Sequence, residues 1–227
     1  AAELREREFK PAARVQVSFL APLEKRALLW LAERLPRWVN SDHLTVLGLV
    51  AMLGAGLSYW LAAWNRYALL LVIVWLAVNW FGDSLDGTLA RVRRQERPRY
   101  GFYVDHAVDA FATLFLLGGL ALSGYMSERV ALGLLIAYFM LCIEVYLATY
   151  TLGTFRLSIA KFSPTELRLL LAVGNIALFF RPIVHLRGEP YRLFDVGGVV
   201  ALAGIGVLLV VSVIQNTVIL YRAERPR

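Results

Sequence analysis

The sequence predicts an all-α integral membrane protein with six transmembrane helices and an N-terminal amphipathic surface helix. Hydrophobic residues make up 59% of the 227 residues and charged residues only 18%, which is too apolar for an ordinary soluble domain. Apolar runs of about 14 to 25 residues recur along the chain without the alternation of a β-barrel strand. The chain therefore divides into a juxtamembrane segment, residues 1–42, and a membrane domain, residues 43–227.

Residues 1–42 mix apolar and charged residues in a pattern typical of a helix that lies on the membrane surface. Pro22 and Pro36 are expected to break this segment, and a solvated arm is the alternative interpretation. Six apolar segments follow and are predicted to be the transmembrane helices: residues 43–64, 67–90, 102–124, 129–152, 165–186 and 194–220.

Basic residues are distributed unevenly between the two sides of the predicted membrane. With these boundaries, 19 Lys and Arg lie in the N-terminal segment, the second and fourth connections and the C-terminal tail, and five lie in the other connections. Because cytoplasmic loops carry the excess of positive residues, both termini are expected in the cytoplasm. We expect an integral protein of the prokaryotic inner membrane, with the 91–101 connection on its cytoplasmic side.

The net charge of +7 comes mainly from arginine, since the chain has 21 Arg against 3 Lys. Guanidinium groups bind phosphate bidentately, so this composition favours anionic headgroups or phosphates as partners. Nucleic acid is not expected as a partner, because no soluble basic domain exists to bind it. The single cysteine, Cys142, lies in an apolar run and excludes a disulfide framework within the chain. The N-terminus is charged, so no signal peptide is predicted.

Four aspartates near the facing ends of the second and third spans are the strongest candidates for a functional site. Asp83 and Asp86 are three residues apart, so they share one helix face. Asp105 and Asp109 are four residues apart and share a face of the next helix. If the two helices are antiparallel neighbours, their ends bring all four carboxylates together.

The two spans are too short to cross the bilayer without these acids. Only 16 apolar residues precede Asp83 in the second span and 14 follow Asp109 in the third, whereas crossing needs about 20. Carboxylates at that depth are costly unless they are paired, and bound divalent cations would remove the cost. Oxygen-only ligands favour Mg²⁺ or Mn²⁺, and four carboxylates are enough for two ions.

Gly87 and Ala90 lie on the same helix face as Asp83, four and seven residues later. Their small size would let a large ligand such as a pyrophosphate approach the helix closely. The alternative interpretation is close helix packing through small residues.

The complete pattern is Asp83-x2-Asp86-Gly87-x2-Ala90-Arg91, nine further residues, and then Gly101-x3-Asp105-x3-Asp109. It resembles the signature of the CDP-alcohol phosphotransferase family, also called the CDP-alcohol phosphatidyltransferases, at all eight fixed positions. The motif covers residues 83–109, and the six-span layout extends the resemblance over most of the chain.

The resemblance implies a homodimeric membrane enzyme of phospholipid biosynthesis. Such an enzyme transfers a phosphoalcohol group from a CDP-linked donor, such as CDP-diacylglycerol, to an acceptor hydroxyl and releases CMP. It also implies that the four aspartates bind a pair of divalent ions and that Asp109 takes the proton from the acceptor hydroxyl. Gly87, Ala90 and Gly101 would make room for the nucleotide, and Arg91 would help to hold phosphate.

Weaker candidates lie before the first span and after the fourth. Asn40 and Thr45 resemble the family's entry to the first helix and are candidate contacts of the CDP donor. The alternative is an N-cap formed by Ser41 or Asp42. Candidate acceptor-binding residues, with positive-inside topology as the alternative, are Arg156, Lys161 and Arg168.

Three polar residues within the spans have open roles. Glu144 either touches the substrate, pairs with an arginine or stays neutral. Asn79 either orients a ligand or makes an interhelical hydrogen bond. His106 is expected to pack or to donate a hydrogen bond near the site.

Two other functions are compatible with the acidic cluster. A cation transporter could use the four aspartates as a permeation site, although such acids are expected near the middle of the membrane on discontinuous helices. A metal-dependent hydrolase could cleave CDP-lipids with water. The pattern leaves open which alcohol is the acceptor and whether CDP carries the lipid or the small headgroup.

Overall fold

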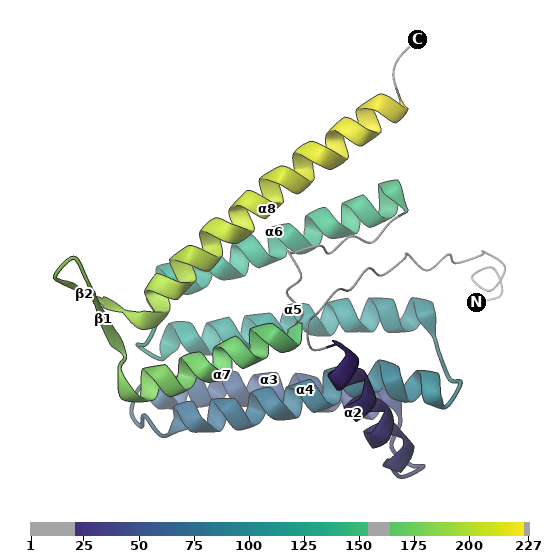
Figure 1. Cartoon of the computed structure of the whole chain (residues 1–227), viewed down its shortest axis with the longest axis horizontal. Coiled ribbons are helices and arrows are strands. Elements are labelled where there is room, and N and C mark those ends of the chain that lie inside the picture. Colours follow the sequence, from purple (N-terminus) through teal and green to yellow (C-terminus); the bar gives the residue numbers. More distant parts are fainter. Residues whose placement is uncertain (1–20, 154–163, 225–227) are drawn as a thin grey trace.

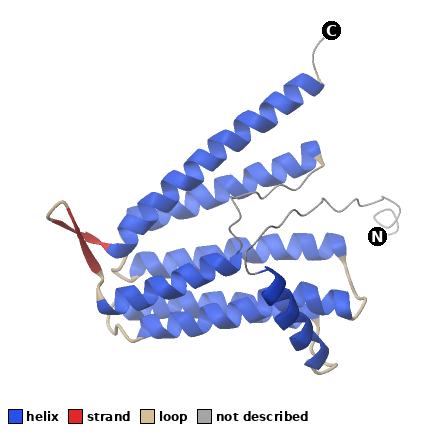
Figure 2. Ribbon diagram, viewed as in Figure 1, coloured by secondary structure: helices blue, strands red, loops and turns tan. Residues whose placement is uncertain are grey.

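The computed structural model describes residues 21–153 and 164–224, and this part of the chain consists of helices and one β-hairpin (Figures 1 and 2). The elements in chain order are α2 (Ala21–Arg34), α3 (Ser41–Ala62), α4 (Ala68–Val92), α5 (Pro98–Leu122), α6 (Glu128–Leu152), α7 (Pro164–Phe180), β1 (Ile183–Leu186), β2 (Glu189–Arg192) and α8 (Leu193–Ala223).

Five of the described helices, namely α3, α4, α5, α6 and α8, are long and apolar enough to cross a membrane. They correspond to five of the six expected spans and differ from the predicted bounds by a few residues. Their surfaces carry many exposed large apolar side chains, as expected for helices that face lipid. The described part of the chain is therefore compatible with a multi-pass membrane protein.

The fifth expected span, residues 165–186, is wrong in its last six residues. Helix α7 has 17 residues and ends at Phe180. Pro182 explains this end, because proline cannot continue a helix and disfavours helical backbone in the residue before it.

Residues 183–186 instead form β1, which pairs antiparallel with β2. Arg187 and Gly188 connect the two strands with φ values of 54° and 90°. Positive φ at both central residues is the geometry of a type I′ turn, the connection that fits the twist of a two-residue hairpin. The apolar residues of β1 therefore extend the chain as a hairpin rather than as a helix.

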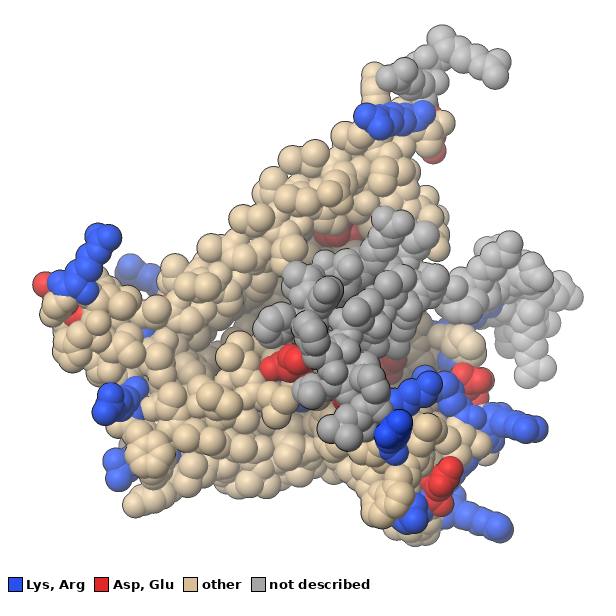
Figure 3. Space-filling model, in the orientation of Figure 1, with Lys and Arg blue, Asp and Glu red and all other residues tan. Residues whose placement is uncertain are grey.

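The long helices run up and down along one axis, with the β-hairpin at one end and α2 lying obliquely across the opposite end (Figure 1). We refer to these as the hairpin end and the α2 end. Helices α3, α4, α5 and α7 lie together, whereas α6 and α8 diverge from them toward the α2 end. On the visible face, Lys and Arg lie mainly toward the ends of the molecule (Figure 3).

Glycines let α3 lie against both α4 and α5. A Cβ atom placed on Gly82 of α4 would come within 2.6 Å of the Leu44 carbonyl oxygen and 2.8 Å of the Gly48 nitrogen. A Cβ atom on Gly119 of α5 would come within 2.0 Å of the Gly56 carbonyl oxygen. Backbone contact at two crossings therefore makes α3 the central helix of the bundle.

The second and third spans need not pack directly on each other for their ends to lie close. The extensive contacts among described residues join α3 to α4 and α3 to α5, while α4 and α5 are not among the well-packed pairs. Their antiparallel course is as expected. The interval between their ends at the α2 end is where the aspartates lie.

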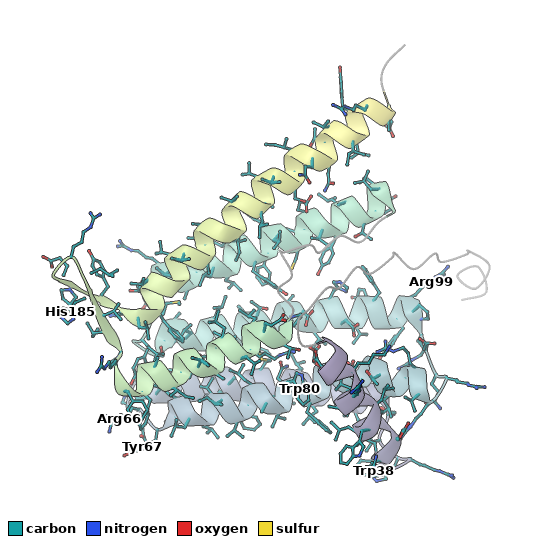
Figure 4. The ribbon with its side chains drawn as sticks, viewed as in Figure 1. Trp38, Arg66, Tyr67, Trp80, Arg99 and His185 are labelled. Carbon is teal, nitrogen blue, oxygen red and sulfur yellow. The ribbon has the colours of Figure 1, made fainter. Side chains whose placement is uncertain are left out.

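Helix α2 lies within residues 1–42, the segment in which a surface helix is predicted, and residues 1–20 lie outside the described part of the chain. Leu28 and Ala32 are buried, and Trp80 of α4, labelled in Figure 4, lies beside α2. Trp80 Nε1 donates a hydrogen bond of 2.8 Å to Oε1 of Glu24 in α2. Pro22 lies in the first turn of α2, where proline is tolerated, and Pro36 follows the end of the helix as expected.

Candidate functional site

The four aspartates lie at the α2 end of α4 and α5. Asp83 and Asp86 belong to α4, and Asp105 and Asp109 belong to α5. The carboxylate of Asp109 interacts electrostatically with the other three and with Arg168 of α7. Asp86 is 8% exposed, whereas Asp109 is classed as exposed. The structure thus brings together the acids that the sequence singled out, from two helices that are held in place by α3.

Thr45 of α3 holds Asp86. Its hydroxyl donates a hydrogen bond of 2.7 Å to Oδ2 of Asp86 and lies 3.1 Å from the Ser41 carbonyl oxygen. This contact crosses from α3 to α4 and fixes one orientation of the carboxylate. Thr45, a predicted contact of the donor, therefore belongs to the acidic site.

Asp83 has a different partner. Nη2 of Arg168 forms an ion pair with Oδ2 of Asp83, and Nε of Arg168 donates a hydrogen bond of 2.7 Å to Oδ1 of Asn79. Asn79 in turn donates a hydrogen bond of 2.9 Å from Nδ2 to the Gly48 carbonyl oxygen. Asn79 thus makes the interhelical hydrogen bond that was one of its expected roles, and it also orients an arginine. Arg168 was expected in a connection, but it lies in α7.

The chemistry of these donors fits a divalent cation, because oxygen ligands are what Mg²⁺ and Mn²⁺ prefer. Two of the carboxylates already have a cation or a hydroxyl as a partner, which shows that this region accepts positive charge and hydrogen-bond donors. In residues 21–153 and 164–224, however, no three His, Cys, Asp or Glu side chains are placed to hold one ion. Rotation of side chains such as Asp83 is needed to bring three carboxylates to one point.

Gly87 is not a packing glycine. Among the described residues, a Cβ atom placed on it would meet only the guanidinium of Arg91, at 3.5 and 3.9 Å, and no other helix. Gly101 would meet nothing within 4 Å. Both differ from Gly82, whose hydrogen faces the backbone of α3. The helix-packing interpretation therefore does not hold for Gly87. Arg91, whose guanidinium lies next to Gly87, donates a hydrogen bond of 3.1 Å to Thr88 Oγ1.

A surface pocket of about 380 Å³ lies beside this site, between the start of α3 and the end of α4. Its lining residues are Asn40, Ser41, Asp42, Leu89, Ala90, Gln95, Glu96 and Arg97. Arg97 forms an ion pair with Asp42 at its rim. Two of the residues expected to contact the donor, Asn40 and Ala90, thus share one pocket.

The N-cap of α3 is Asn40 and not Ser41 or Asp42 as expected. The Asn40 side chain accepts a hydrogen bond of 2.9 Å from the His43 backbone N–H. His43 Nδ1 accepts from the Asn40 backbone N–H at 3.3 Å, which completes a capping box. His43 takes the role usually filled by Glu or Gln, so the sequence pattern did not reveal it.

Glu144 has a partner that the sequence did not indicate. Asn216 Nδ2 of α8 donates a hydrogen bond of 2.7 Å to Oε1 of Glu144 in α6. His106 packs as expected, since its ring lies 4.2 Å from that of Phe102 and 5.2 Å from that of Tyr146, centroid to centroid. Two candidate acceptor-binding residues, Arg156 and Lys161, lie outside the described residues.

Arg93 is a structural residue that the sequence analysis missed. Its guanidinium donates to the carbonyl oxygens of Leu35 at 3.1 Å and Pro36 at 2.9 Å, and also to that of Val39. It therefore ties the connection between α2 and α3 to the end of α4. No local signal distinguishes Arg93 from its neighbours in an arginine-rich connection, because its acceptors are backbone atoms more than 50 residues away in the chain.

Comparison of the sequence with protein-family models and with curated proteins finds no match.

Proposed function

We propose that this protein is an integral-membrane CDP-alcohol phosphotransferase of phospholipid biosynthesis. The observation that carries the proposal is the convergence of the eight-residue pattern at the α2 end. Its acids come from two helices and interact electrostatically, and among the described residues a Cβ atom on its first glycine, Gly87, would meet only the Arg91 guanidinium and no other helix. A site for a phosphate-rich ligand needs both features, because the ligand requires room beside the carboxylates that would hold the charge-neutralising ions.

The reaction is a transfer of a phosphoalcohol group to an acceptor hydroxyl. The acceptor oxygen forms a bond to the phosphorus that carries the alcohol, and the bond from that phosphorus to the bridging oxygen breaks. CMP leaves with the bridging oxygen, while the proton of the hydroxyl passes to the carboxylate of Asp109. Asp109 suits this role because its side chain is exposed at the site.

Asp83, Asp86, Asp105 and Asp109 are the residues that would hold two Mg²⁺ or Mn²⁺ ions. When bound, these ions would neutralise the pyrophosphate and the leaving CMP. Thr45 orients Asp86 through its hydroxyl, and Arg91 offers a guanidinium to a phosphate oxygen beside Gly87.

The membrane topology belongs to the same proposal. Six spans, including α7, place the α2 end and both termini in the cytoplasm, in a prokaryotic inner membrane. In Figure 4, Trp38 and Arg99 mark this end, and Arg66, Tyr67 and His185 mark the hairpin end. A cytoplasmic site would meet a lipid from the membrane and a water-soluble substrate from the cytosol, and the active form is expected to be a homodimer.

The test is CMP release by the purified enzyme, with Mg²⁺ or Mn²⁺ and a panel of CDP-linked donors and acceptor alcohols. Asp109→Asn is expected to lower turnover by at least about 100-fold, because the base is lost. The turnover of Asp83→Asn should also be much lower than that of the wild type. Glu189→Gln, an exposed carboxylate on the hairpin, is the control and should keep normal turnover.

Near-normal turnover in both Asp variants would contradict the proposal. CMP release that is independent of any acceptor would indicate a hydrolase instead. Ion flux through the protein in vesicles without nucleotide would indicate a cation transporter.

A further inference from the structure

Arg168 of α7 is in direct contact with the acidic site, through an ion pair with Asp83. It projects from the second turn of α7 toward α4, and only 16% of its side-chain surface is exposed. Its Nε and Nη2 atoms bind Asn79 and Asp83, two residues that lie one turn apart on α4. Its third nitrogen, Nη1, is buried and has no hydrogen-bond partner among the residues that the structure describes.

Asn79 fixes the direction in which Arg168 can approach. Its side chain is 5% exposed, and its Nδ2 is committed to the Gly48 carbonyl oxygen of α3. Its Oδ1 must then face α7, where it accepts from Nε of Arg168. Arg168 is therefore held by a chain of contacts that begins on the backbone of α3 and passes through α4.

The ion pair with Arg168 sets the orientation of Asp83. Asp83 is 38% exposed, so its carboxylate has room to turn toward the other acids, yet it is bound by the guanidinium. The positive charge of Arg168 also acts on Asp109 across the interval between α4 and α5. One arginine thus offsets the charge of a site where four carboxylates interact.

We infer that Arg168 is a displaceable counter-ion, which competes with the divalent cation for Asp83. In the ion-free protein, Arg168 binds Asp83 and reduces the repulsion among the four acids. Asp83 joins the other carboxylates as a ligand only when the guanidinium releases it. This inference rests on the proposed function, since it assumes that Asp83 is a metal ligand, and it makes Arg168 a positioning residue rather than a catalytic one.

Two possible roles of Arg168 predict opposite changes in metal affinity when the arginine is removed. An arginine that served only to support Asp83 as a ligand would strengthen metal binding, so its loss would weaken it. An arginine that competes for Asp83 weakens metal binding, and its loss should strengthen it. The unpartnered Nη1 atom favours the second role, because a guanidinium with one unsatisfied buried donor is not held at its best arrangement.

The experiment is calorimetric titration of Mn²⁺ into the full-length purified protein in detergent, without nucleotide. Arg168→Gln is expected to bind Mn²⁺ about three- to tenfold more tightly than the wild type, which corresponds to the loss of one competing ion pair. Arg181→Gln is the matched control, because Arg181 is exposed just beyond the other end of α7. It removes the same charge far from Asp83 and should leave the affinity within about twofold.

Asn79→Ala keeps the arginine but removes one of its two anchors, and it covers the case in which Arg168→Gln does not fold. It is expected to tighten Mn²⁺ binding by a smaller factor, of about two to three. Unchanged or weaker binding in the variant that folds would overturn the inference.

Mn²⁺ binding by the wild type distinguishes a failure of this inference from a failure of the proposed function. If the wild type binds Mn²⁺ and Asp83→Asn abolishes binding, but Arg168→Gln binds no more tightly, only the role of Arg168 is wrong. If the wild type binds no Mn²⁺ at all, the proposed metal-dependent function fails and the inference fails with it.

Discussion

Replacing Gly119 by alanine should disturb the bundle at its closest crossing. The new Cβ atom would lie 2.0 Å from the Gly56 carbonyl oxygen and 2.5 Å from the Gly56 Cα atom. A Cβ atom keeps about 3.2 Å from an oxygen, so α5 must move away from α3 by about 1.2 Å. Both contacts are with backbone, so a change of side-chain rotamer cannot relieve them.

The change in the free energy of unfolding for Gly119→Ala combines an overpacking penalty with a gain in helix propensity. Overpacking of this kind costs about 1 to 3 kcal/mol, and a clash with backbone belongs at the upper end. Alanine in a helix is better than glycine by about 1 kcal/mol. The net expectation for Gly119→Ala is a destabilisation of about 2 kcal/mol.

The neighbouring residue supplies a matched control. Gly118 lies in the same helix, and a Cβ atom there would meet nothing within 4 Å. Gly118→Ala should therefore gain helix propensity without a clash and stabilise the protein by about 0.5 to 1 kcal/mol. The two variants have identical composition and differ only in which face of α5 receives the methyl group.

The assay is thermal unfolding of both purified variants in the same detergent. A difference of about 3 kcal/mol corresponds to roughly 6 to 12 °C in Tm for a chain of this size, with Gly119→Ala the lower. Equal Tm values, or a higher value for Gly119→Ala, would refute the close backbone contact between α3 and α5. The position of Asp105 and Asp109 would then also need to be reconsidered, because this crossing sets the place of α5.

Two further predictions concern polar and small residues near the site. Gly87→Ala adds a methyl group that makes ordinary contact with the Arg91 guanidinium, so Tm should stay equal or rise by a few degrees. The methyl group also occupies space proposed for the CDP donor, so kcat/KM for this donor should fall at least about tenfold. An unchanged kcat/KM would contradict a ligand position beside Gly87. Glu144→Leu removes the acceptor of the Asn216 hydrogen bond and should lower Tm, whereas Glu144→Gln can keep that bond and should retain both Tm and CMP release. A loss of CMP release in a well-folded Glu144→Gln would instead assign Glu144 to the substrate.

Local sequence signals located the helices well where apolar residues are continuous. Helices α3, α4, α5, α6 and α8 lie close to their expected positions, because a long apolar segment in a membrane has to satisfy its own backbone hydrogen bonds. The error came at Pro182 and the Arg187–Gly188 turn. The residues there are apolar enough for a helix, but proline and a type I′ turn impose a backbone geometry that a helix cannot adopt.

The site shows the same division between local and distant effects. Spacing within one helix correctly grouped Asp83 with Asp86 and Asp105 with Asp109, since such grouping depends only on helix periodicity. The partners of these acids were not predictable in the same way. Thr45 reaches Asp86 from 41 residues away, and Arg168 reaches Asp83 from 85 residues away.

The sequence by itself determined that the helices are apolar enough to cross a membrane, the positions of most of them and the identity of the acidic residues. These follow from composition, segment length and helical periodicity, which act over neighbouring residues. Only the tertiary structure decided that α3 packs against both α4 and α5, that Gly82 packs on α3 while Gly87 meets no other described helix, and that Asp83 is bound to Arg168. Such contacts join residues that are distant in the chain, and they depend on how closely each helix backbone approaches the next.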